Sequence, residues 1–159
     1  MPPIRIILAV SEDGFIADSG GEIPWHLPFD LKWFKMNTVG STVGMGRITW
    51  DSLVKPLSNR HHLILSTRNL NLDWDDDVEQ CYSISKFKKR LEETNGWLIG
   101  GANVCKQFFF KDNIIVLTNV HTTINFGTHI ELPPMKTLWK SKKIKENGYK
   151  FTLSINKII

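Results

Sequence analysis

Apolar residues along this chain fall into short runs separated by polar, glycine-containing segments. The first run, Ile4 to Val10, is almost continuously apolar, which predicts a strand buried on both faces, as in a parallel sheet. Further short apolar runs predict strands at Thr42–Met45, His62–Ser66, Val78–Tyr82, Trp97–Ile99 and Asn113–Val120. Intervening segments predict helices at Arg47–Leu53, Ser85–Glu93 and Asn103–Lys111. Strands that alternate with helices favour an α/β fold with a mostly parallel, twisted central sheet and flanking helices.

Three segments complete this picture. Residues 11–23 contain three glycines and predict a long, mobile loop, a suitable place for a lid. Residues 24–37 change to helical periodicity, and Pro28 fits the first helical position. Residues 137–144 and 149–158 flank Asn-Gly, a strong hairpin signal. We therefore expect about eight strands, with an antiparallel C-terminal hairpin at one edge.

Composition supports one globular domain over residues 1–159. The chain has a mass of 18.3 kDa and is 42% hydrophobic and 23% charged, which is ordinary for a domain of this size. No apolar stretch is long enough to span a membrane, and no secretory signal precedes the first strand. The two cysteines, Cys81 and Cys105, form no Cys-x-x-Cys pair, and no spacing indicates a metal site. We expect a reduced, cytoplasmic protein without a bound metal.

Charge is unevenly distributed along the chain. The net charge is +4, but residues 1–80 have a balance of −4 and residues 81–159 a balance of +8. The excess lies in Lys136, Lys140, Lys142, Lys143, Lys145 and Lys150. These lysines are compatible with a nucleic-acid contact or with a lysine-protected sheet edge. We favour the edge, because no nucleic-acid-binding motif accompanies the charge.

Two segments have the order strand, glycine, helix: Val43–Trp50 and Leu98–Val104. Glycine lets a backbone approach a ligand closely, and the following helix offers free N–H groups. Neither segment has the spacing of the common dinucleotide or P-loop motifs. Two such turns on one sheet are suited to grip a pyrophosphate, with Arg47 beside them; the alternative is that each glycine only makes a tight turn.

A third turn, Leu65–Arg68, follows another predicted strand. Its two hydroxyls and its arginine suit a phosphate monoester such as the 2′-phosphate of a dinucleotide. The alternative is a capped turn with a solvent-exposed arginine.

One carboxylate lies in unusually apolar surroundings. Asp30 belongs to the segment PWHLPFDL and occupies the first turn of a predicted helix, where the helix dipole favours negative charge. Its apolar neighbours should raise its pKa by desolvation. Such a group suits a flat, protonatable heterocycle with an amidine-like edge, although it would also stabilise a helix start without binding anything.

These motifs occur together in one known family. The strings PWHLPFDLKWFK, MGRITWDSL, KPLSNR, LSTR, IGGANV and VLTNV occur in this order. From about Ile4 to Ile158 the chain closely resembles dihydrofolate reductases. The loop SEDGFIA is also similar to pyrimidine reductases of riboflavin synthesis, which share the fold but lack the PWxLPxDL helix start.

The resemblance implies an NADPH-dependent enzyme that reduces 7,8-dihydrofolate to tetrahydrofolate, in support of one-carbon metabolism and thymidylate synthesis. Asp30 would bind N3 and the 2-amino group of the pterin and promote protonation at N5, with water delivering the proton. Trp25 would help to hold that water, and Thr118 would steady the carboxylate. Antifolates would be ligands, and we expect a monomer that binds neither nucleic acid nor membrane.

The resemblance also implies two sets of binding residues. Those for substrate are Ile7, Ala9, Asp30, Leu31, Phe34, Lys35, Leu53, Leu57, Arg60, Ile99 and Thr118, and Arg60 would pair with the glutamate α-carboxylate. Those for cofactor are Ala9, Ile16, Gly46, Arg47, Ile48, Thr49, Ser52, Leu65, Ser66, Thr67, Arg68, Ile99, Gly100, Gly101, Ala102, Asn103 and Val104. A cis peptide is expected at Gly100-Gly101. The chain departs from the family at Ala17, at Ile48 and at Cys105, where an aromatic residue is usual.

Two other function classes remain at this point. One is a pyrimidine reductase, disfavoured by Asp30 and Arg60. The other is a protein that binds folate, nucleotide or nucleic acid without catalysis.

Overall fold

The computed structural model describes residues 2–70, 72 and 77–159. The strands are β1 (Arg5–Ser11), β2 (Phe15–Asp18), β3 (Thr42–Gly46), β4 (His61–Leu65), β5 (Val78–Cys81), β6 (Trp97–Gly100), β7 (Ile114–Val120), β8 (Gly127–His129), β9 (Met135–Lys140), β10 (Ile144–Glu146) and β11 (Tyr149–Ile158). The helices are α1 (Pro28–Thr38), α2 (Arg47–Ser52), α3 (Ile84–Thr94) and α4 (Ala102–Lys106).

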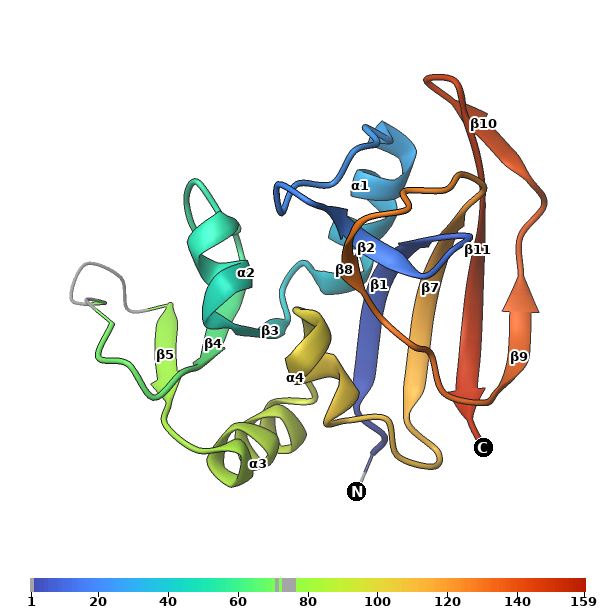
Figure 1. Cartoon of the computed structure of the whole chain (residues 1–159). Coiled ribbons are helices and arrows are strands. Elements are labelled where there is room, and N and C mark those ends of the chain that lie inside the picture. Colours follow the sequence, from blue (N-terminus) through green and yellow to red (C-terminus); the bar gives the residue numbers. More distant parts are fainter. Residues whose placement is uncertain (1, 71, 73–76) are drawn as a thin grey trace.

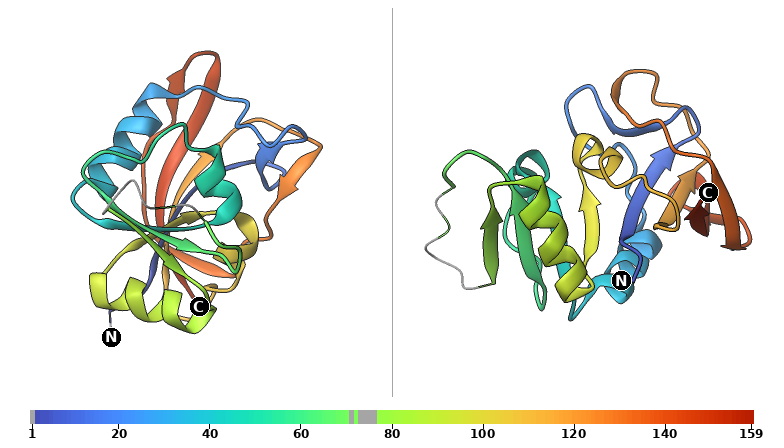
Figure 2. Two further views of the ribbon diagram at one scale, coloured as in Figure 1. Left: turned by 90° about the vertical axis from the view of Figure 1, so that its left-hand side faces the viewer. Right: turned by 90° about the horizontal axis from the view of Figure 1, so that it is seen from below.

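One large sheet runs through the molecule (Figure 1 and Figure 2). Its described strands number nine, in the order β10-β11-β7-β1-β6-β3-β4-β5, with β9 also paired to β11. The six strands from β7 to β5 in this order are parallel, and β11 is antiparallel to β7. The expected fold class, a mostly parallel α/β sheet with an antiparallel C-terminal edge, is confirmed.

Alternation along the strands builds a core on each face of this sheet. In β1, Ile6 and Leu8 join a cluster with Phe87 of α3 and Cys105 of α4, whereas Ile7 joins a cluster on the opposite face. That second cluster includes side chains from α1 and α2, such as Phe34 and Leu53. The helices therefore cover both faces, as expected for strands that are apolar on both sides.

Local signals explain where α3 begins and ends. Ser83 caps it by accepting a hydrogen bond from the Lys86 N–H, and Asn95 ends it in a left-handed conformation with φ of 51°. The expected helix at 103–111 was too long, since α4 ends at Lys106. Beyond that residue Gln107 and Phe108 donate to carbonyls three positions back, which closes the helix with tighter turns.

The C-terminal hairpin has the expected turn. Asn147 and Gly148 both have positive φ, 49° and 81°, between the paired residues Glu146 and Tyr149. The expected strand over 137–144 is, however, two strands, β9 and β10, which both pair with the long β11. Ser141 lies between them, and its hydroxyl accepts from the Leu153 N–H at 2.9 Å, so a side chain replaces one hydrogen bond of the ladder.

The segment 11–23 contains a strand that its polar, glycine-rich sequence does not suggest. Strand β2 pairs with β8 in a separate two-stranded sheet, and the carboxylate of Asp13 accepts from the backbone N–H groups of Ile124 and Asn125. The interpretation as a loop throughout was therefore wrong, because the strand depends on partners more than a hundred residues away.

The lysine-rich part of the chain lies along the outer edge of the sheet. Lys136 and Lys140 are exposed on β9, and Lys145 is exposed on β10. This position fits the lysine-protected edge favoured from the sequence. Across the described ranges, no helix has the length and apolar character needed to cross a membrane.

Candidate functional site

The pairing between strands β1 and β6 ends early, so the sheet splits between them toward their carboxyl ends. Strand β1 pairs with β7 along its full length, from Arg5 to Ser11, but with β6 only at Arg5 and Ile6. Chain connections also change direction here, since β6 leads through α4 to β7 on the far side of β1. In α/β proteins ligands bind at the carboxyl ends of strands at such a switch point, and Figure 1 shows α1 near this end of β1 and β7.

Asp30 and Thr118 meet at this point. The Thr118 hydroxyl, on β7, donates to Oδ1 of Asp30, on α1, at 2.5 Å. Thr118 is buried, and its neighbour across the ladder is Ala9 of β1. The structure thus brings together two of the three residues, Asp30, Trp25 and Thr118, that the resemblance implies for catalysis, although these two are 88 positions apart.

Desolvation dominates the charge state of Asp30. Burial raises the pKa of this carboxyl, the hydrogen bond from Thr118 lowers it, and the negative charge of Glu146 raises it again, with a net shift upward. A half-buried acid with a raised pKa and one strong hydrogen-bond donor is the kind of group that exchanges protons during catalysis.

The position of Asp30 follows from the local sequence. Pro28 takes the first helical position of α1, and Leu27 before it offers no side-chain cap. The first available N–H is that of Phe29, and it donates to Oε1 of Glu146 at 2.9 Å. Asp30 follows in the first turn, where a carboxylate is favoured by the helix dipole.

Apolar clusters lie on both sides of Thr118 along β7, since Val116 belongs to one cluster and Val120 to the other. Trp25 and Leu27 are buried in a cluster with Val120 and Phe151, and Ala9 packs against it. On the other side lie the predicted substrate residues Ile7, Phe34, Leu53, Leu57 and Ile99, which the structure brings into one cluster. Leu31 and Lys35 are exposed on α1 and do not join either cluster.

Arg60 is held rigidly at the far end of this wall. Its side chain donates to the Ser58 carbonyl and to the Thr38 hydroxyl, each at 3.0 Å, and its guanidinium carbon lies 5.8 Å from the centre of the Phe34 ring. Burial lowers the pKa of Arg60, but an arginine stays charged. No ion pair to Arg60 occurs in the described parts of the chain, so this fixed cation is suited to an external carboxylate.

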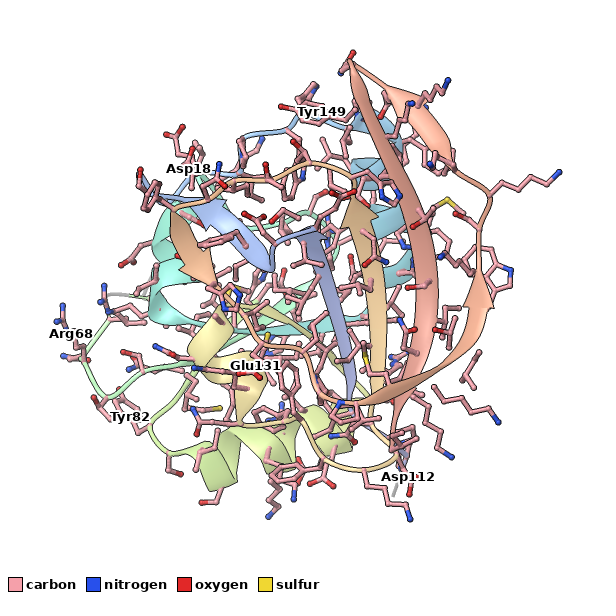
Figure 3. The ribbon with its side chains drawn as sticks, turned by 45° about the vertical axis from the view of Figure 1, so that its right-hand side comes forward. Asp18, Arg68, Tyr82, Asp112, Glu131 and Tyr149 are labelled. Carbon is pink, nitrogen blue, oxygen red and sulfur yellow. The ribbon has the colours of Figure 1, made fainter. Side chains whose placement is uncertain are left out.

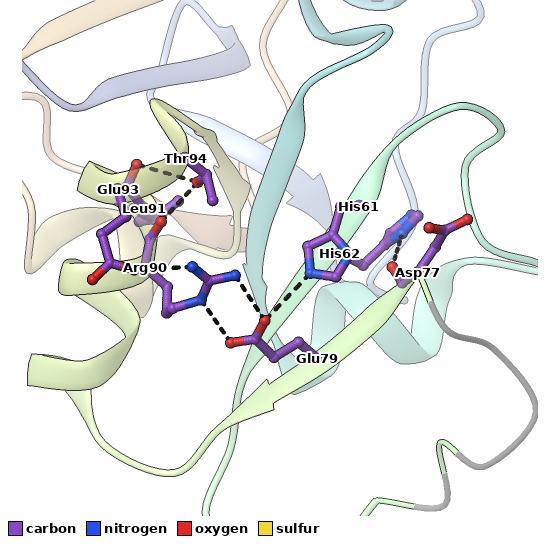
Figure 4. Close-up of polar contacts among 8 residues, drawn as sticks. All are labelled: His61, His62, Asp77, Glu79, Arg90, Leu91, Glu93 and Thr94. Carbon is purple, nitrogen blue, oxygen red and sulfur yellow. Dashed lines mark hydrogen bonds and ion pairs between the residues drawn. The ribbon is translucent and has the colours of Figure 1, made fainter.

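His62 supports this segment, and the sequence analysis missed it. Its ring is fully buried; Nε2 accepts from the Leu57 N–H at 3.0 Å, and Nδ1 lies 3.2 Å from the Asp77 carbonyl. Figure 4 shows the second contact. Nε2 must be unprotonated to accept, so the arrangement selects a neutral ring with its proton on Nδ1.

Figure 4 also shows an ion-pair network that joins β4, β5 and α3. Glu79 accepts from Arg90 at 2.9 and 3.1 Å and lies 3.4 Å from His61, and Arg90 also pairs with Glu93. The network lowers the pKa of Glu79 through the hydrogen bonds from Arg90. It ties together the part of the sheet that carries the third turn.

The two glycine turns adjoin each other. A Cβ added at Gly46, the last residue of β3, would lie 2.9 Å from Cγ2 of Val104, on α4. A Cβ added at Gly100, the last residue of β6, would lie 3.0 Å from the Thr49 hydroxyl, on α2. Glycine is therefore required where each backbone approaches a side chain that follows the other turn, and Gly100-Gly101 has the expected cis peptide.

Other predicted cofactor residues differ in their surroundings. Arg47 pairs with Asp51 on the same helix at 2.7 Å, so it would exchange this partner to bind an anion. Ile48 is 75% exposed. The Ser52 hydroxyl donates to the Thr49 carbonyl. Ala102 is buried, Asn103 is exposed, and Ile16 and Leu65 pack against the core.

Cys105 is fully buried, and burial raises the pKa of its thiol to about 12, so this thiol is neutral and unreactive.

The third turn is organised by Gln80, another residue that the sequence analysis missed. Its side-chain amide donates to the carbonyls of Ser66 and Arg68, and its oxygen accepts from the Leu70 N–H at 3.2 Å. The Ser66 hydroxyl also accepts from the Arg68 N–H at 3.1 Å. These bonds give residues 66–70 a defined shape, with Thr67 exposed at its tip.

The fold and this arrangement define a class: α/β proteins with a split parallel sheet, a half-buried carboxylate at the start of the first helix and glycine turns at the ends of two parallel strands. Comparison with known proteins places the chain further. The family model for dihydrofolate reductase matches residues 3–156. The dihydrofolate reductase of Buchnera aphidicola subsp. Acyrthosiphon pisum is 31% identical over 162 residues, covering 96% of this chain and 97% of its own. That of Haemophilus influenzae is 33% identical over 132 residues, covering 81% and 77%.

A solved structure agrees with these relatives. The dihydrofolate reductase of Enterococcus faecalis, complexed with NADP(H) and RAB-propyl, has a TM-score of 0.80 and 25% identity, covering 98% of this chain and 95% of its own. The chain belongs to the dihydrofolate reductase family.

Proposed function

We propose that the chain reduces 7,8-dihydrofolate to 5,6,7,8-tetrahydrofolate with a hydride from NADPH. Membership of the family supports this activity. The observation that carries the proposal is the contact between Asp30 and Thr118 at the carboxyl end of the split sheet. A carboxylate with a hydroxyl donor on an apolar wall offers two parallel acceptor positions to N3–H and the 2-amino group of a pterin.

Asp30 binds the pterin and favours its protonation. Its negative charge, little screened beside Trp25 and Leu27, stabilises a proton at N5 by attraction. The carboxylate binds the N3 side of the ring and does not reach N5, so a water delivers the proton. Trp25 helps to order that water, and Thr118 keeps the carboxylate in the plane of the pterin.

The apolar cluster and Arg60 position the rest of the substrate. Ile7, Phe34, Leu53, Leu57 and Ile99 exclude water from the pterin and the aminobenzoyl ring, with Ala9, Leu31 and Lys35 at the rim. Arg60 pairs with the α-carboxylate of the glutamate. Its two internal hydrogen bonds fix the guanidinium in advance, which reduces the entropy lost on binding.

The residues of the glycine turns fit a dinucleotide. Gly46 and Gly101 precede the first residues of α2 and α4, and the backbone N–H groups at these helix starts receive a pyrophosphate, assisted by Arg47, Thr49, Ala102, Asn103 and Val104. When bound, NADPH supplies the hydride that reduces C6 of the pterin. Ser66, Thr67 and Arg68 bind the 2′-phosphate and select NADPH over NADH.

The proposal also includes further cofactor contacts, a lid over the site, and the oligomeric state and location of the enzyme. Ala9, Ile16 and Ile99 border the nicotinamide, Ile48, Ser52, Leu65 and Gly101 border the rest of the dinucleotide, and residues 11–23 act as a lid. The enzyme acts as a cytoplasmic monomer, binds antifolates in the pterin site and binds no nucleic acid or membrane.

Loss of absorbance at 340 nm with dihydrofolate and NADPH tests the activity, with NADH and methotrexate as controls. We expect fast oxidation that prefers NADPH and is inhibited. If neither NADPH nor NADH is oxidised in the presence of dihydrofolate, the proposed activity is refuted.

The variant Asp30→Asn tests the acid. We expect it to keep the fold and NADPH binding but to lose most hydride transfer at neutral pH, with recovery at low pH, where the substrate is already protonated. An unchanged rate at pH 7 would refute the role of Asp30.

A further inference from the structure

The start of α1 is capped by a residue from the far end of the chain. Helix starts leave N–H groups without intrahelical partners, and in α1 neither Leu27 nor Pro28 meets this need. Glu146, the last residue of β10, accepts from the Phe29 N–H at 2.9 Å. This is a charged acceptor at a helix N-terminus, where negative charge is stabilising.

The turn after β10 is fixed against the segment before α1. Nδ2 of Asn147 donates to the His26 carbonyl at 2.8 Å, and the Tyr149 hydroxyl donates to the Pro24 carbonyl at 3.4 Å. Figure 1 shows the top of the β10–β11 hairpin beside the start of α1. Three contacts on successive parts of this segment hold the Glu146 carboxylate in one position.

We propose that Glu146 is a positioning residue for Asp30: it fixes the first turn of α1, so that Asp30 meets Thr118 and the pterin, and its charge favours a proton at this site. The inference rests on the proposed function and adds a residue from outside the catalytic motifs.

The electrostatic part follows from the geometry. Asp30 comes directly after the residue that Glu146 caps, so two carboxylates share one helix start. The charge of Glu146 raises the pKa of Asp30, in addition to the larger effect of burial and against the hydrogen bond from Thr118. In the complex, where Asp30 is ionised and binds the pterin, the same charge favours a proton at N5 by direct attraction.

Other charged groups around Asp30 are more exposed to solvent. Lys32 and Lys35 on α1 and Lys145 and Lys150 on the hairpin are exposed, where water and salt screen their charge. The facing residues of β7 and β1, Thr118 and Ala9, carry no charge, and His26 before the helix is exposed. Glu146 is half-buried, and its charge raises the pKa of Asp30.

Two variants separate the cap from the charge. Glu146→Gln keeps an oxygen that accepts from the Phe29 N–H but removes the charge, whereas Glu146→Ala removes both. The matched control is Glu131→Gln, because Glu131 is exposed on the connection between β8 and β9. Figure 3 labels Glu131 far from Tyr149, which adjoins the capping turn.

The measurement is the rate of hydride transfer in single turnovers with excess NADPH, from about pH 5 to 9. We expect Glu146→Gln to move the midpoint of the profile to lower pH, so that the rate falls several-fold above the midpoint and stays unchanged well below it. Glu146→Ala should show the same shift and also a lower rate at every pH and a lower Tm. Glu131→Gln should match the parent protein.

A Glu146→Gln profile equal to that of the parent would overturn the electrostatic role, and a Glu146→Ala rate at low pH equal to that of the parent would overturn the positioning role. Failure of the proposed function is a separate result, since the parent protein itself would then show no turnover.

Discussion

The hydroxyl of Thr118 is the single group whose removal tests the acid site most cleanly. Thr118→Val keeps the shape of the side chain and removes only the donor that lies 2.5 Å from Oδ1 of Asp30. The hydroxyl stabilises the charged carboxylate and lowers the pKa of Asp30. Its loss therefore raises that pKa further, which is opposite in sign to the effect expected for Glu146→Gln.

The magnitude follows from the kind of hydrogen bond. A bond to a charged acceptor contributes about 1.5–3 kcal/mol. Asp30 is half-buried, so water replaces part of the lost bond, and the lower end of the range applies. Since about 1.4 kcal/mol corresponds to a factor of ten, we expect kcat/KM for dihydrofolate to fall about tenfold at neutral pH.

Steady-state kinetics across pH check both the fall in kcat/KM and the upward shift of the Asp30 pKa. The kcat/KM profile reports the free enzyme, in which Asp30 must be ionised to bind the pterin edge. The tenfold loss should therefore be accompanied by an acid limb whose midpoint lies at higher pH, whereas KM for NADPH should not change. Thr152→Val is the matched control: Thr152 is buried on β11, and its hydroxyl has no hydrogen-bond partner among the described residues. A midpoint that moves to lower pH, or equal losses in both variants, would refute the reasoning.

Three further outcomes are expected. Gln80→Leu should raise KM for NADPH about tenfold, because it removes hydrogen bonds worth about 0.5–1.5 kcal/mol each, and should change KM for NADH little. Gln107→Leu is the control variant, and equal changes of KM for both cofactors would contradict a role of the third turn in binding the 2′-phosphate. Arg60→Lys should raise KM for dihydrofolate about tenfold but leave KM for a pterin without glutamate unchanged. Steady-state kinetics with both substrates check this, and an equal rise for both would contradict the pairing of Arg60 with the glutamate. Gly44→Ala places a Cβ 2.8 Å from the Phe87 ring and 2.9 Å from Leu91 and should destabilise the fold by about 1–3 kcal/mol in urea, whereas Gly20→Ala, with only a 3.4 Å contact, should not.

Local signals in the sequence were sufficient for much of the fold. Pro28 at the first position of α1, the Asn147-Gly148 turn and the glycines that end β3 and β6 act over a few residues, so their structures follow from neighbouring residues alone. Asp30 was predictable for the same reason, since its position in the first turn and its apolar neighbours belong to one short segment.

Features that depend on distant partners were not predictable in this way. Strand β2 exists because β8 pairs with it, and the break between β9 and β10 exists because both strands share β11. The supporting roles of His62, Gln80 and Glu146 likewise depend on which backbone groups the fold places beside them. Gln80 is one glutamine in a strand and Glu146 is one glutamate before a turn, and the residues next to them form no pattern that would reveal a supporting role.

The capping of α1 by β10 also determines when the site can exist during protein synthesis. Asp30 is made early, but its partner Thr118 and the cap Glu146 come 88 and 116 residues later. At about 5–20 residues per second, a ribosome needs roughly 6–23 s to pass from one carboxylate to the other. A nascent chain released before the β10–β11 hairpin is made would therefore lack both the cap of the catalytic helix and strand β11 beside Thr118. Asp30 acquires its working environment only after this hairpin has been made.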